Sequence, residues 1–492
     1  MCNIELQNVP QRKGENLLHI AEAVVVSGLL FCCMSDGFIY GQMSGMIDAL
    51  RADDSPIPLT EDDVSWLAST INITCIVGFI IVGVIADVLG RRIAITTLST
   101  PVLICWIVIY YTGDKFVLQL TRVIVGVSYG GVLLLTFITI GEYVSPNIRP
   151  FCFNFMASVG SISGVTLGHI LSTLMDWRKV ALVGIIPTGL SCILPLLWEE
   201  SPSWLASKGR FEECKKTFEA LHLPSEKSNA ELRNLIALEM KKKRDLLRVH
   251  STSGSVRKNL YVLKQWYFWK IQMLSFIIGI YRVAAGRILF STILLTMLPE
   301  LTGYKDIFFC TLLVDGLGMF GAAVSCYTVS KFRMRPLLFS TGIAANFLLI
   351  ILSALIYYGS TDVFSTWTKV VLLGAYYVVT FAGPYPVIDT VLGEIQPLGV
   401  KEFSLFICGS IAGVMHFVAI KIAPDMIKTI GYSGLFLVYA MFVFICLIYL
   451  WFFMPETRGR SLQEIEVFFM NGKFEDRKIF LSSEQKEDLL SV

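Results

Sequence analysis

Twelve long apolar runs constrain this chain more than any other feature of its sequence. Each run has about 20 residues or more, the length that an α-helix needs to cross the hydrocarbon core of a bilayer. The runs cover residues 20–42, 64–87, 93–112, 117–141, 152–175, 178–198, 270–298, 306–329, 336–358, 367–393, 403–423 and 432–454. The sequence therefore predicts an all-α membrane protein with twelve transmembrane helices in two six-helix halves.

Composition agrees with a chain surrounded by lipid. Of the 492 residues, 54% are hydrophobic and only 16% are charged, fewer charges than soluble domains carry. The formal net charge of +2 gives no electrostatic reason to expect a nucleic acid as partner. Cysteines such as Cys32, Cys75 and Cys446 lie within apolar runs and have no metal-ligand or disulfide spacing. We therefore expect a lipid bilayer as the surroundings, no metal and no other cofactor.

The runs and the charged intervals between them predict the domain organisation. A polar segment opens the chain without the apolar core of a cleaved signal peptide, and a charged interval rich in Lys and Glu divides the two halves. We expect a cytoplasmic N-terminus (1–19), an N-terminal six-helix half (20–198), a cytoplasmic linker with short helices (199–269), a C-terminal six-helix half (270–454) and a cytoplasmic tail (455–492).

Basic residues near the ends of the runs predict the orientation in the membrane. All of the clusters fall on one side, which the positive-inside rule makes the cytoplasmic side. The opposite side has acidic loops, and Asn72, which begins an Asn-Ile-Thr sequon, lies inside a run, so no N-glycan is expected there. Both termini are therefore expected in the cytoplasm. The clusters are Arg12–Lys13, Arg91–Arg92, Arg149, the central interval, Lys331–Arg335, Lys401 and Arg458–Arg460.

The hinge between the second and third runs carries the first specific motif. Glycines at 83 and 90 allow a very short turn, Asp87 can lie near the positive N-terminus of the next helix, and Arg91 and Arg92 add positive charge. Placed between two apolar spans, this spacing resembles the signature loop of the major facilitator superfamily.

Further motifs resemble the sugar porter family of that superfamily, and most of all the insect facilitated trehalose and hexose transporters. The motifs are Arg122 with Gly126, Glu142 to Arg149, Glu200 to Arg210, Glu394 to Lys401, Lys421 to Asp425 and Pro455 to Leu462. The resemblance implies a monomeric carrier of a small molecule in the plasma membrane that exposes its site to each side in turn.

The resemblance also implies a cytoplasmic gate of charged residues at the span ends. Pairs that form across the two halves stabilise the state closed on that side, at about 0.2 to 1 kcal/mol each, so they bias the equilibrium without locking it. The second-half hinge, 330–336, has lost the Asp and the Gly, which predicts an asymmetric gate. The gate residues are Asp87, Arg91, Arg92, Glu142, Arg149, Glu200, Glu394, Lys401, Glu456 and Arg458.

The substrate-binding positions depart from the sugar porter pattern. Counting from the flanking motifs, Ala157 and Ala412 fall where the family has Gln and Asn, and Asp389 falls where it has Trp. Charged residues instead lie inside apolar runs, where each costs several kcal/mol unless paired or hydrated. These residues, Arg282, Arg287, Asp315 and Asp389, are either substrate-binding residues or internal ion pairs that line a wet cavity.

Smaller polar groups complete the candidate site. We name Tyr385, Asn154, Ser161 and Ser410 as further substrate-binding candidates, whereas His169 and His416 are expected to be satisfied core residues. If the charges face the cavity, a buried Asp can carry a proton as coupling ion, or Arg282 can recognise an anionic or strongly hydrogen-bonding solute. The residues leave both possibilities open.

Together these patterns predict a secondary transporter rather than an enzyme, because no nucleotide loop or nucleophile-and-base arrangement stands in an accessible loop. A sugar, trehalose or a hexose, is the first candidate solute. The alternatives are a proton-coupled carrier of a charged or non-sugar organic solute, and a transporter-like solute sensor.

Overall fold

The regular secondary structure in the part of the chain that the structure describes is entirely helical. The computed structural model describes residues 5–51, 57–144, 148–221, 232–233, 235–237, 239–240, 263–304, 306–359, 362–397, 400–460 and 462–474, with side chains except at 5–21, 401–402 and 462–463. No strand occurs in these ranges. The predicted fold class is therefore confirmed. The basic side chains of 12–13 and 401, and those at 241–244, lie outside the described part.

The first half contains six membrane-spanning segments. Four are single helices: α1 (Glu5–Arg51), α2 (Glu61–Leu89), α3 (Arg91–Tyr111) and α4 (Lys115–Tyr143). The fifth span joins α5 (Arg149–Asn154), the π-helical turn η1 (Phe155–Gly160) and α6 (Ser161–Leu174), and the sixth joins α7 (Trp177–Val183), α8 (Ile185–Ile193) and the 3₁₀ turn η2 (Leu194–Leu197). Short helices α9 (Pro202–Ser207) and α10 (Phe211–Leu221) follow.

The second half contains two interrupted spans. The seventh span is α13 (Trp266–Ala284) followed by α14 (Arg287–Thr302), and the tenth is α17 (Val363–Ala382) followed by α18 (Pro384–Glu394). The eighth and ninth are α15 (Phe308–Lys331) and α16 (Met334–Tyr358). The long helix α19 (Lys401–Phe453) comes next, and α20 (Leu462–Asn471) lies beyond it.

Helix α19 supplies the last two spans. Its 53 residues would extend about 80 Å as one straight helix, far more than a bilayer is thick. Gly431 interrupts it with φ 67° and ψ 178°, a backbone conformation that favours glycine. Eleven described helical stretches are long and apolar enough to cross a membrane, and the last of them is divided at Gly431. The chain is therefore a multi-pass membrane protein with twelve spans.

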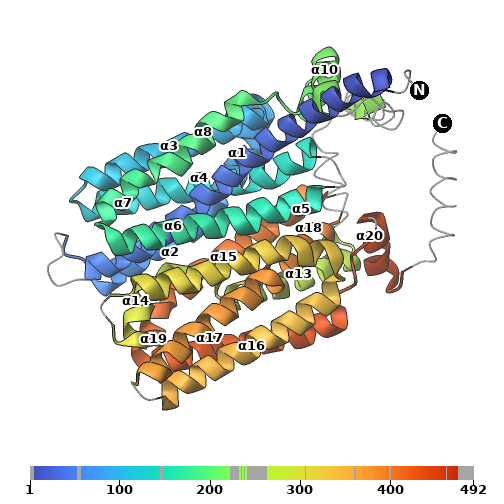
Figure 1. Cartoon of the computed structure of the whole chain (residues 1–492). Coiled ribbons are helices and arrows are strands. Elements are labelled where there is room, and N and C mark those ends of the chain that lie inside the picture. The colour runs from blue at the N-terminus through green and yellow to red at the C-terminus, as the bar shows by residue number, and fades with distance from the viewer. Residues whose placement is uncertain are drawn as a thin grey trace.

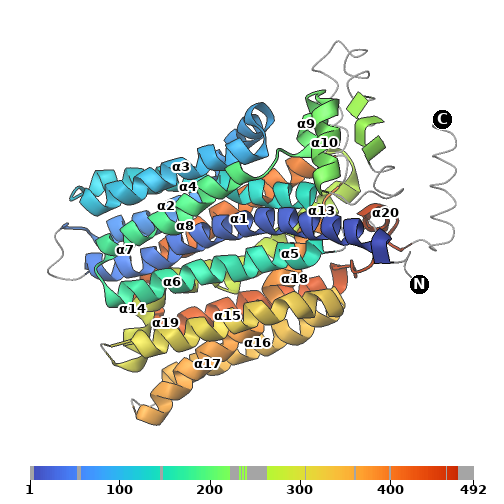
Figure 2. The same ribbon diagram turned by 45° about the horizontal axis from the view of Figure 1, so that its top comes forward.

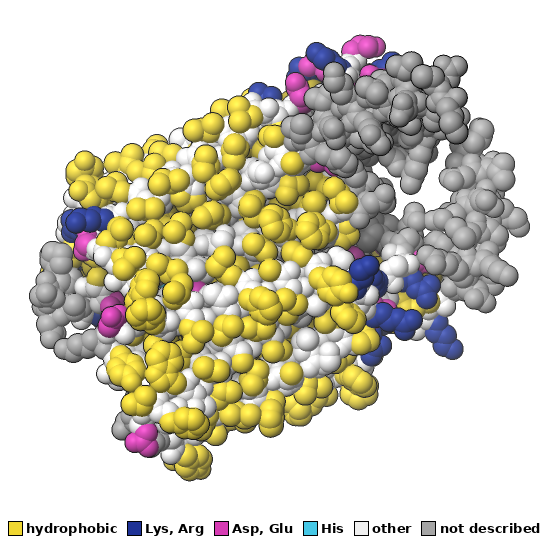
Figure 3. Space-filling model, in the orientation of Figure 1, with side chains coloured by type: hydrophobic (Ala, Val, Ile, Leu, Met, Phe, Trp, Pro, Cys, Tyr) yellow, Lys and Arg dark blue, Asp and Glu magenta, His cyan; other side chains and the backbone are white. Residues whose placement is uncertain are grey.

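The two halves lie side by side with their helices along a common direction (Figure 1, Figure 2). Contacts between them are made mainly by α2 with α19, α1 with α14, and α6 with α15. Apolar side chains cover the flank of the bundle, and Lys and Arg side chains gather at the end near α20 (Figure 3). We call this end, which holds Arg91, Arg92, Arg333, Arg335 and Arg458, the basic end, and the other the opposite end.

Small residues let α1 and α6 approach closely. A Cβ atom at Gly41 would collide with the backbone of Val165, and one at Gly168 would lie 2.7 Å from the backbone nitrogen of Gln42. Membrane helices associate through such contacts because lipid provides no hydrophobic driving force between them. The tight α1–α6 pair is one part of the face of the first half that contacts the second, through α14 and α15.

Substitution of Gly168 by Val should therefore separate α1 from α6. We expect it to lower the free energy of unfolding by about 1 to 3 kcal/mol, as overpacking does, measured by denaturant titration in mixed micelles. Gly316→Val is the matched control, because Gly316 is an exposed helical glycine with no atom within 4 Å of its would-be Cβ. Equal effects of the two substitutions would contradict this account of the packing.

Candidate functional site

A cavity of about 760 Å³ lies between the two halves. Its walls come from α2 and α4 on one side and from α13, α18 and α19 on the other. The lining extends from Tyr129 and Asp389 at the inner end to Phe153 and Val400, which lie where α5 and α19 begin at the basic end. The cavity therefore opens toward the basic end, a suitable shape for a site that a small molecule reaches from that side.

The inner end of this cavity continues into a smaller pocket. Tyr129, Arg282 and Asp389 line both spaces, so the two are contiguous. The pocket adds Asp36 of α1, Ser161 of α6 and Arg287 of α14. Charged and hydroxyl groups from both halves thus meet at one place in the middle of the bundle.

Two helix breaks bring the charged groups together. Gly286 has φ +76° between α13 and α14, so Arg282 and Arg287 lie on either side of a turn instead of on one continuous helix. Asp389 lies on α18, just after the break at Gly383 and Pro384. Discontinuous helices are the usual way in which transporters place a binding site near the middle of the membrane.

Asp389 is shared by both arginines. Its Oδ1 lies 3.3 Å from Nη1 of Arg282, and its Oδ2 lies 3.6 Å from Nη1 of Arg287. Arg287 also donates a hydrogen bond of 3.0 Å to the carbonyl of Ala157 in the first half. Its guanidinium lies over the rings of Phe381 and Tyr385, which favour a cation. The three residues thus form ion pairs at the wall of the cavity, and their role in substrate binding stays a prediction.

Asp315 takes a different place from the one expected beside the arginines. It is fully buried, and its Oδ2 lies 2.8 Å from Nδ1 of His169. The other ring nitrogen of His169, Nε2, lies 2.7 Å from the carbonyl oxygen of Ser291. His169 is thus a satisfied core residue, as predicted, and Asp315 contacts it across the two halves instead of lining the cavity.

Of the remaining candidates, some line the cavity and others form hydrogen bonds within the helix packing. Ser161 lines the inner pocket, whereas Tyr385 donates to the carbonyl of Ala285 at 2.6 Å, and Asn154 donates to Ser325 Oγ at 2.7 Å. The Oγ of Ser410 is buried without a hydrogen-bond partner in the described part of the chain. His416, expected in the core, is buried but lines the cavity.

Asp36 is the functional candidate that the sequence reasoning missed. Its side chain is 8% exposed, and its Oδ2 has no hydrogen-bond partner among the described residues. It lines the inner pocket together with Arg282 and Arg287. The signal was available, because an acidic residue inside the apolar run 20–42 meets the same rule that selected Asp389.

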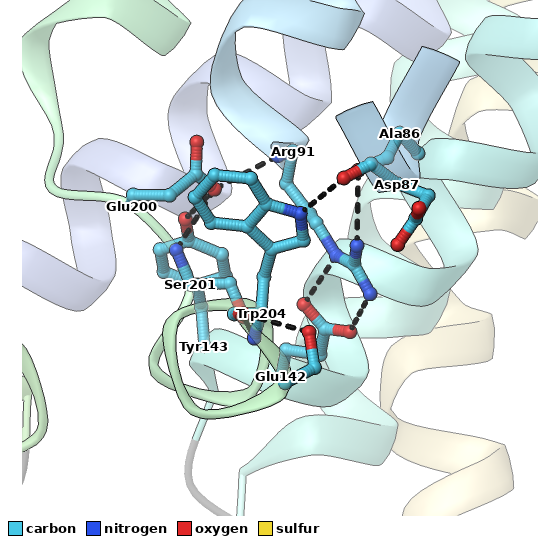
Figure 4. A network of polar contacts seen from close by, with 9 residues as sticks. Ala86, Asp87, Arg91, Glu142, Tyr143, Glu200, Ser201 and Trp204 are labelled. Carbon is cyan, nitrogen blue, oxygen red and sulfur yellow. Dashed lines mark hydrogen bonds and ion pairs between the residues drawn. The ribbon is translucent and has the colours of Figure 1, made fainter. Parts of the chain in front are cut away.

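Arg91, Glu142 and Glu200 form one network at the hinge of the first half, with Asp87 and Trp204 beside it (Figure 4). Arg91 donates to both carboxylate oxygens of Glu142, at 2.9 and 2.7 Å, and its backbone nitrogen donates to Glu200 at 2.8 Å. The indole of Trp204 donates to the carbonyl of Asp87, whose carboxylate pairs with Lys208 at 2.9 Å. A carboxylate thus caps the start of α3, where the helix dipole favours negative charge.

The second half repeats this cap. Glu456 accepts hydrogen bonds from the backbone nitrogens of Met334 and Arg335 at the start of α16, at 3.0 and 3.1 Å. Arg335 donates to the carbonyl of Trp451, just as Arg92 donates to the carbonyl of Trp198 in the first half. The two hinges are therefore alike in this cap, because the cap needs a carboxylate from elsewhere and neither an Asp nor a Gly in the hinge itself. The asymmetry of the gate as a whole stays a prediction.

Other gate residues also bond locally. Arg149 donates to the carbonyl of Val144 at 3.2 and 3.0 Å, and Arg458 donates to the carbonyl of Ser330. Glu394 is the last residue of α18, and the side chain of Lys401 lies outside the described part. Each gate contact named above stays within one half, an arrangement that suits a bundle open at its basic end.

Two six-helix halves around a central cavity, with broken helices at its wall, define a membrane carrier of the major facilitator type. A family model described as "Sugar (and other) transporter" matches residues 22–469, so the chain belongs to that family of transporters.

Similar proteins include the facilitated trehalose transporters of two insects. The one from Polypedilum vanderplanki is 24% identical over 83% of this chain and 80% of its own length, and the one from Bombyx mori is 24% identical over 93% and 88%. A solved structure of a proton:xylose symporter bound to 6-bromo-6-deoxy-D-glucose has a TM-score of 0.72 at 18% identity, over 93% of this chain and 100% of that chain. This last similarity concerns the fold.

Because Asp389 pairs with both Arg282 and Arg287, its substitution should destabilise the protein. Asp389→Asn leaves two guanidinium groups without their counter-charge and should lower the free energy of unfolding by about 1 to 3 kcal/mol, between the costs for surface and buried pairs. Asp87→Asn, which breaks the exposed pair with Lys208, should cost under about 1 kcal/mol in the same titration. A similar small cost for both would show that the central cluster is solvated like a surface pair.

Proposed function

We propose that the protein is a secondary transporter that moves a small solute, a sugar in the first place, by alternating access. The single observation that carries the proposal is the cavity between the halves, which ends at a cluster of polar groups from both and opens toward the basic end. A cavity between two halves can be exposed to either side of the membrane by a rocking of one half against the other.

Contacts at the opposite end support transport by alternating access, because they close that side of the bundle. Ser44 Oγ of α1 accepts a hydrogen bond of 3.1 Å from the backbone nitrogen of Leu295 on α14. Lys421 of α19 pairs with Asp62 of α2 and lies 4.6 Å over the ring of Trp66. All of these contacts cross between the halves. With the basic end in the cytoplasm, the conformation is the one that faces inward.

Trehalose or a hexose is the first candidate solute, because the similar insect proteins carry the name of facilitated trehalose transporters. Ser161, Tyr129 and the Arg282–Asp389–Arg287 cluster offer hydrogen-bond donors and acceptors to the hydroxyls of a sugar. Ala157 and Ala412 both lie at the cavity wall, so the amides of related pockets are replaced there by apolar groups.

The second candidate is a proton-coupled carrier of a charged or non-sugar organic solute, or a sensor of such a solute. The observation that favours it is the concentration of charge at the inner end, where Asp36 and Asp389 face two arginines. We further propose a monomer in the plasma membrane, with both termini and the linker at 199–269 in the cytoplasm, as the basic end requires.

Uptake of labelled trehalose and glucose into cells that express the protein tests the proposal. We expect saturable uptake of at least one sugar, and a decrease of tenfold or more for Asp389→Asn, because the substitution removes the anion that orients both arginines. Uptake is measured at neutral and mildly acidic external pH, with surface expression checked for each variant. Glu219→Gln, at an exposed position on the short helix α10 outside the spans and the gate, is the control.

The outcomes separate the candidates. Sugar uptake that is insensitive both to pH and to Asp389→Asn would keep the sugar transporter and remove the charged cluster from its mechanism. Absence of sugar uptake by protein at the cell surface would favour the second candidate. A screen of charged metabolites would then separate a carrier from a sensor.

A further inference from the structure

His169 and Asp315 join the two halves where no solvent reaches them. His169 is on α6 in the first half, Asp315 is on α15 in the second, and both side chains have 0% exposure. The imidazole also contacts α14 through the carbonyl of Ser291. One turn further along α14, Leu295 donates its backbone nitrogen to Ser44 of the first half. These contacts belong to the closure of the opposite end.

The two hydrogen bonds of His169 fix the number of protons on the pair. A carbonyl oxygen can only accept, so Nε2 must carry a hydrogen to bond to Ser291. If the ring is neutral, Nδ1 then has only a lone pair, and it can meet Asp315 Oδ2 at 2.8 Å only if the carboxyl is protonated. If the ring is charged, Nδ1 donates to a carboxylate. In both cases the pair holds one proton more than a neutral imidazole beside a carboxylate.

When His169 and Asp315 separate, the hydrogen bonds that require the extra proton are lost. When the halves part at the opposite end, His169 and Asp315 become hydrated, and at neutral pH a hydrated histidine is mostly neutral while a hydrated aspartate is ionised. The proton that the closed pair held is then released to the side that has opened.

We infer that His169 and Asp315 form a proton-binding site that exists only while the opposite end of the bundle is closed. The inference rests on the alternating access proposed above and assigns that cycle a proton site outside the solute cavity. Protonation favours the closed form, so a lower pH shifts the equilibrium toward closure of the opposite end.

Within the described part of the chain, no neighbouring ionisable group forms an ion pair with His169 or Asp315 beyond their own contact. Elements packed around it carry Asp36 and Tyr40 on α1, Arg287 on α14, and Lys369 and Tyr377 on α17. Arg287 is engaged by Asp389, and no ion pair joins Asp315 to Lys369 within the described part of the chain. Tyr377 interacts electrostatically with Asp315, but a phenol carries no positive charge and cannot serve as a counter-ion. With no second counter-ion, only the proton neutralises the buried charge of Asp315.

A distance measurement across the opposite end tests the inference without any solute. Spin labels are attached at Gly113→Cys, between α3 and α4, and at Tyr304→Cys, between α14 and α15, where side chains are exposed or meet open space. The cysteines of the described residues are buried, and protein without the two substitutions measures background labelling. Pulsed electron resonance on the full chain in lipid nanodiscs then gives the populations of short and long distances.

We expect the ratio of short to long distances to rise by up to about tenfold for each pH unit of acidification, the slope for one linked proton. Asp315→Asn should abolish this dependence and keep the short distance, since its amide can donate to Nδ1 of a neutral His169 without an extra proton. Asp48→Asn, the same change on an exposed part of α1, should retain the slope.

Two other kinds of result would contradict the inference. Two populations whose ratio ignores pH, or a pH dependence that survives Asp315→Asn, would overturn the proton site and leave alternating access intact. A single distance at every pH, with and without sugar, would overturn alternating access and the inference with it.

Discussion

Every backbone polar group in the hydrocarbon must find a partner within the protein, and this requirement shapes the whole structure. It makes each span a helix and confines irregular backbone to places where protein or a cavity surrounds it. The two breaks at Gly286 and Gly383 obey the rule, because both adjoin the central cluster. The interruptions of the spans therefore lie at the site. The turn at Gly286 separates Arg282 from Arg287, and the break at Gly383 places Asp389 beside both arginines.

The halves are built alike where they are charged. Glu200 and Glu456 both cap the start of a span, the third and the ninth, although the hinges there differ in sequence; Glu200 accepts from one backbone nitrogen of the helix and Glu456 from two. Electrostatics at the start of a helix depends on where a carboxylate lies and not on which segment provides it. Each half can therefore keep its shape as a unit while the contacts between the halves change.

Span number, fold class and the presence of charged residues within the spans were predictable, because apolar length and intramembrane charge are local signals. The pairing of those charges was not. Asp315 could have met an arginine as easily as His169, since the choice depends on helix rotation and depth. Asp36 was missed for a different reason. An acidic residue within an apolar run could be recognised from the sequence, but its place beside Arg282 and Arg287 follows only from the packing of α1 against the second half. The cap of the ninth span was not predicted, because the comparison of the two hinges considered only their Asp and Gly residues, whereas the capping Glu456 lies outside the hinge.

The division of α19 at Gly431 has a mechanical consequence. A single glycine joins the last two spans, with no loop long enough to absorb a displacement. A displacement of the first part of α19 against α2 is therefore passed directly to the start of the final span.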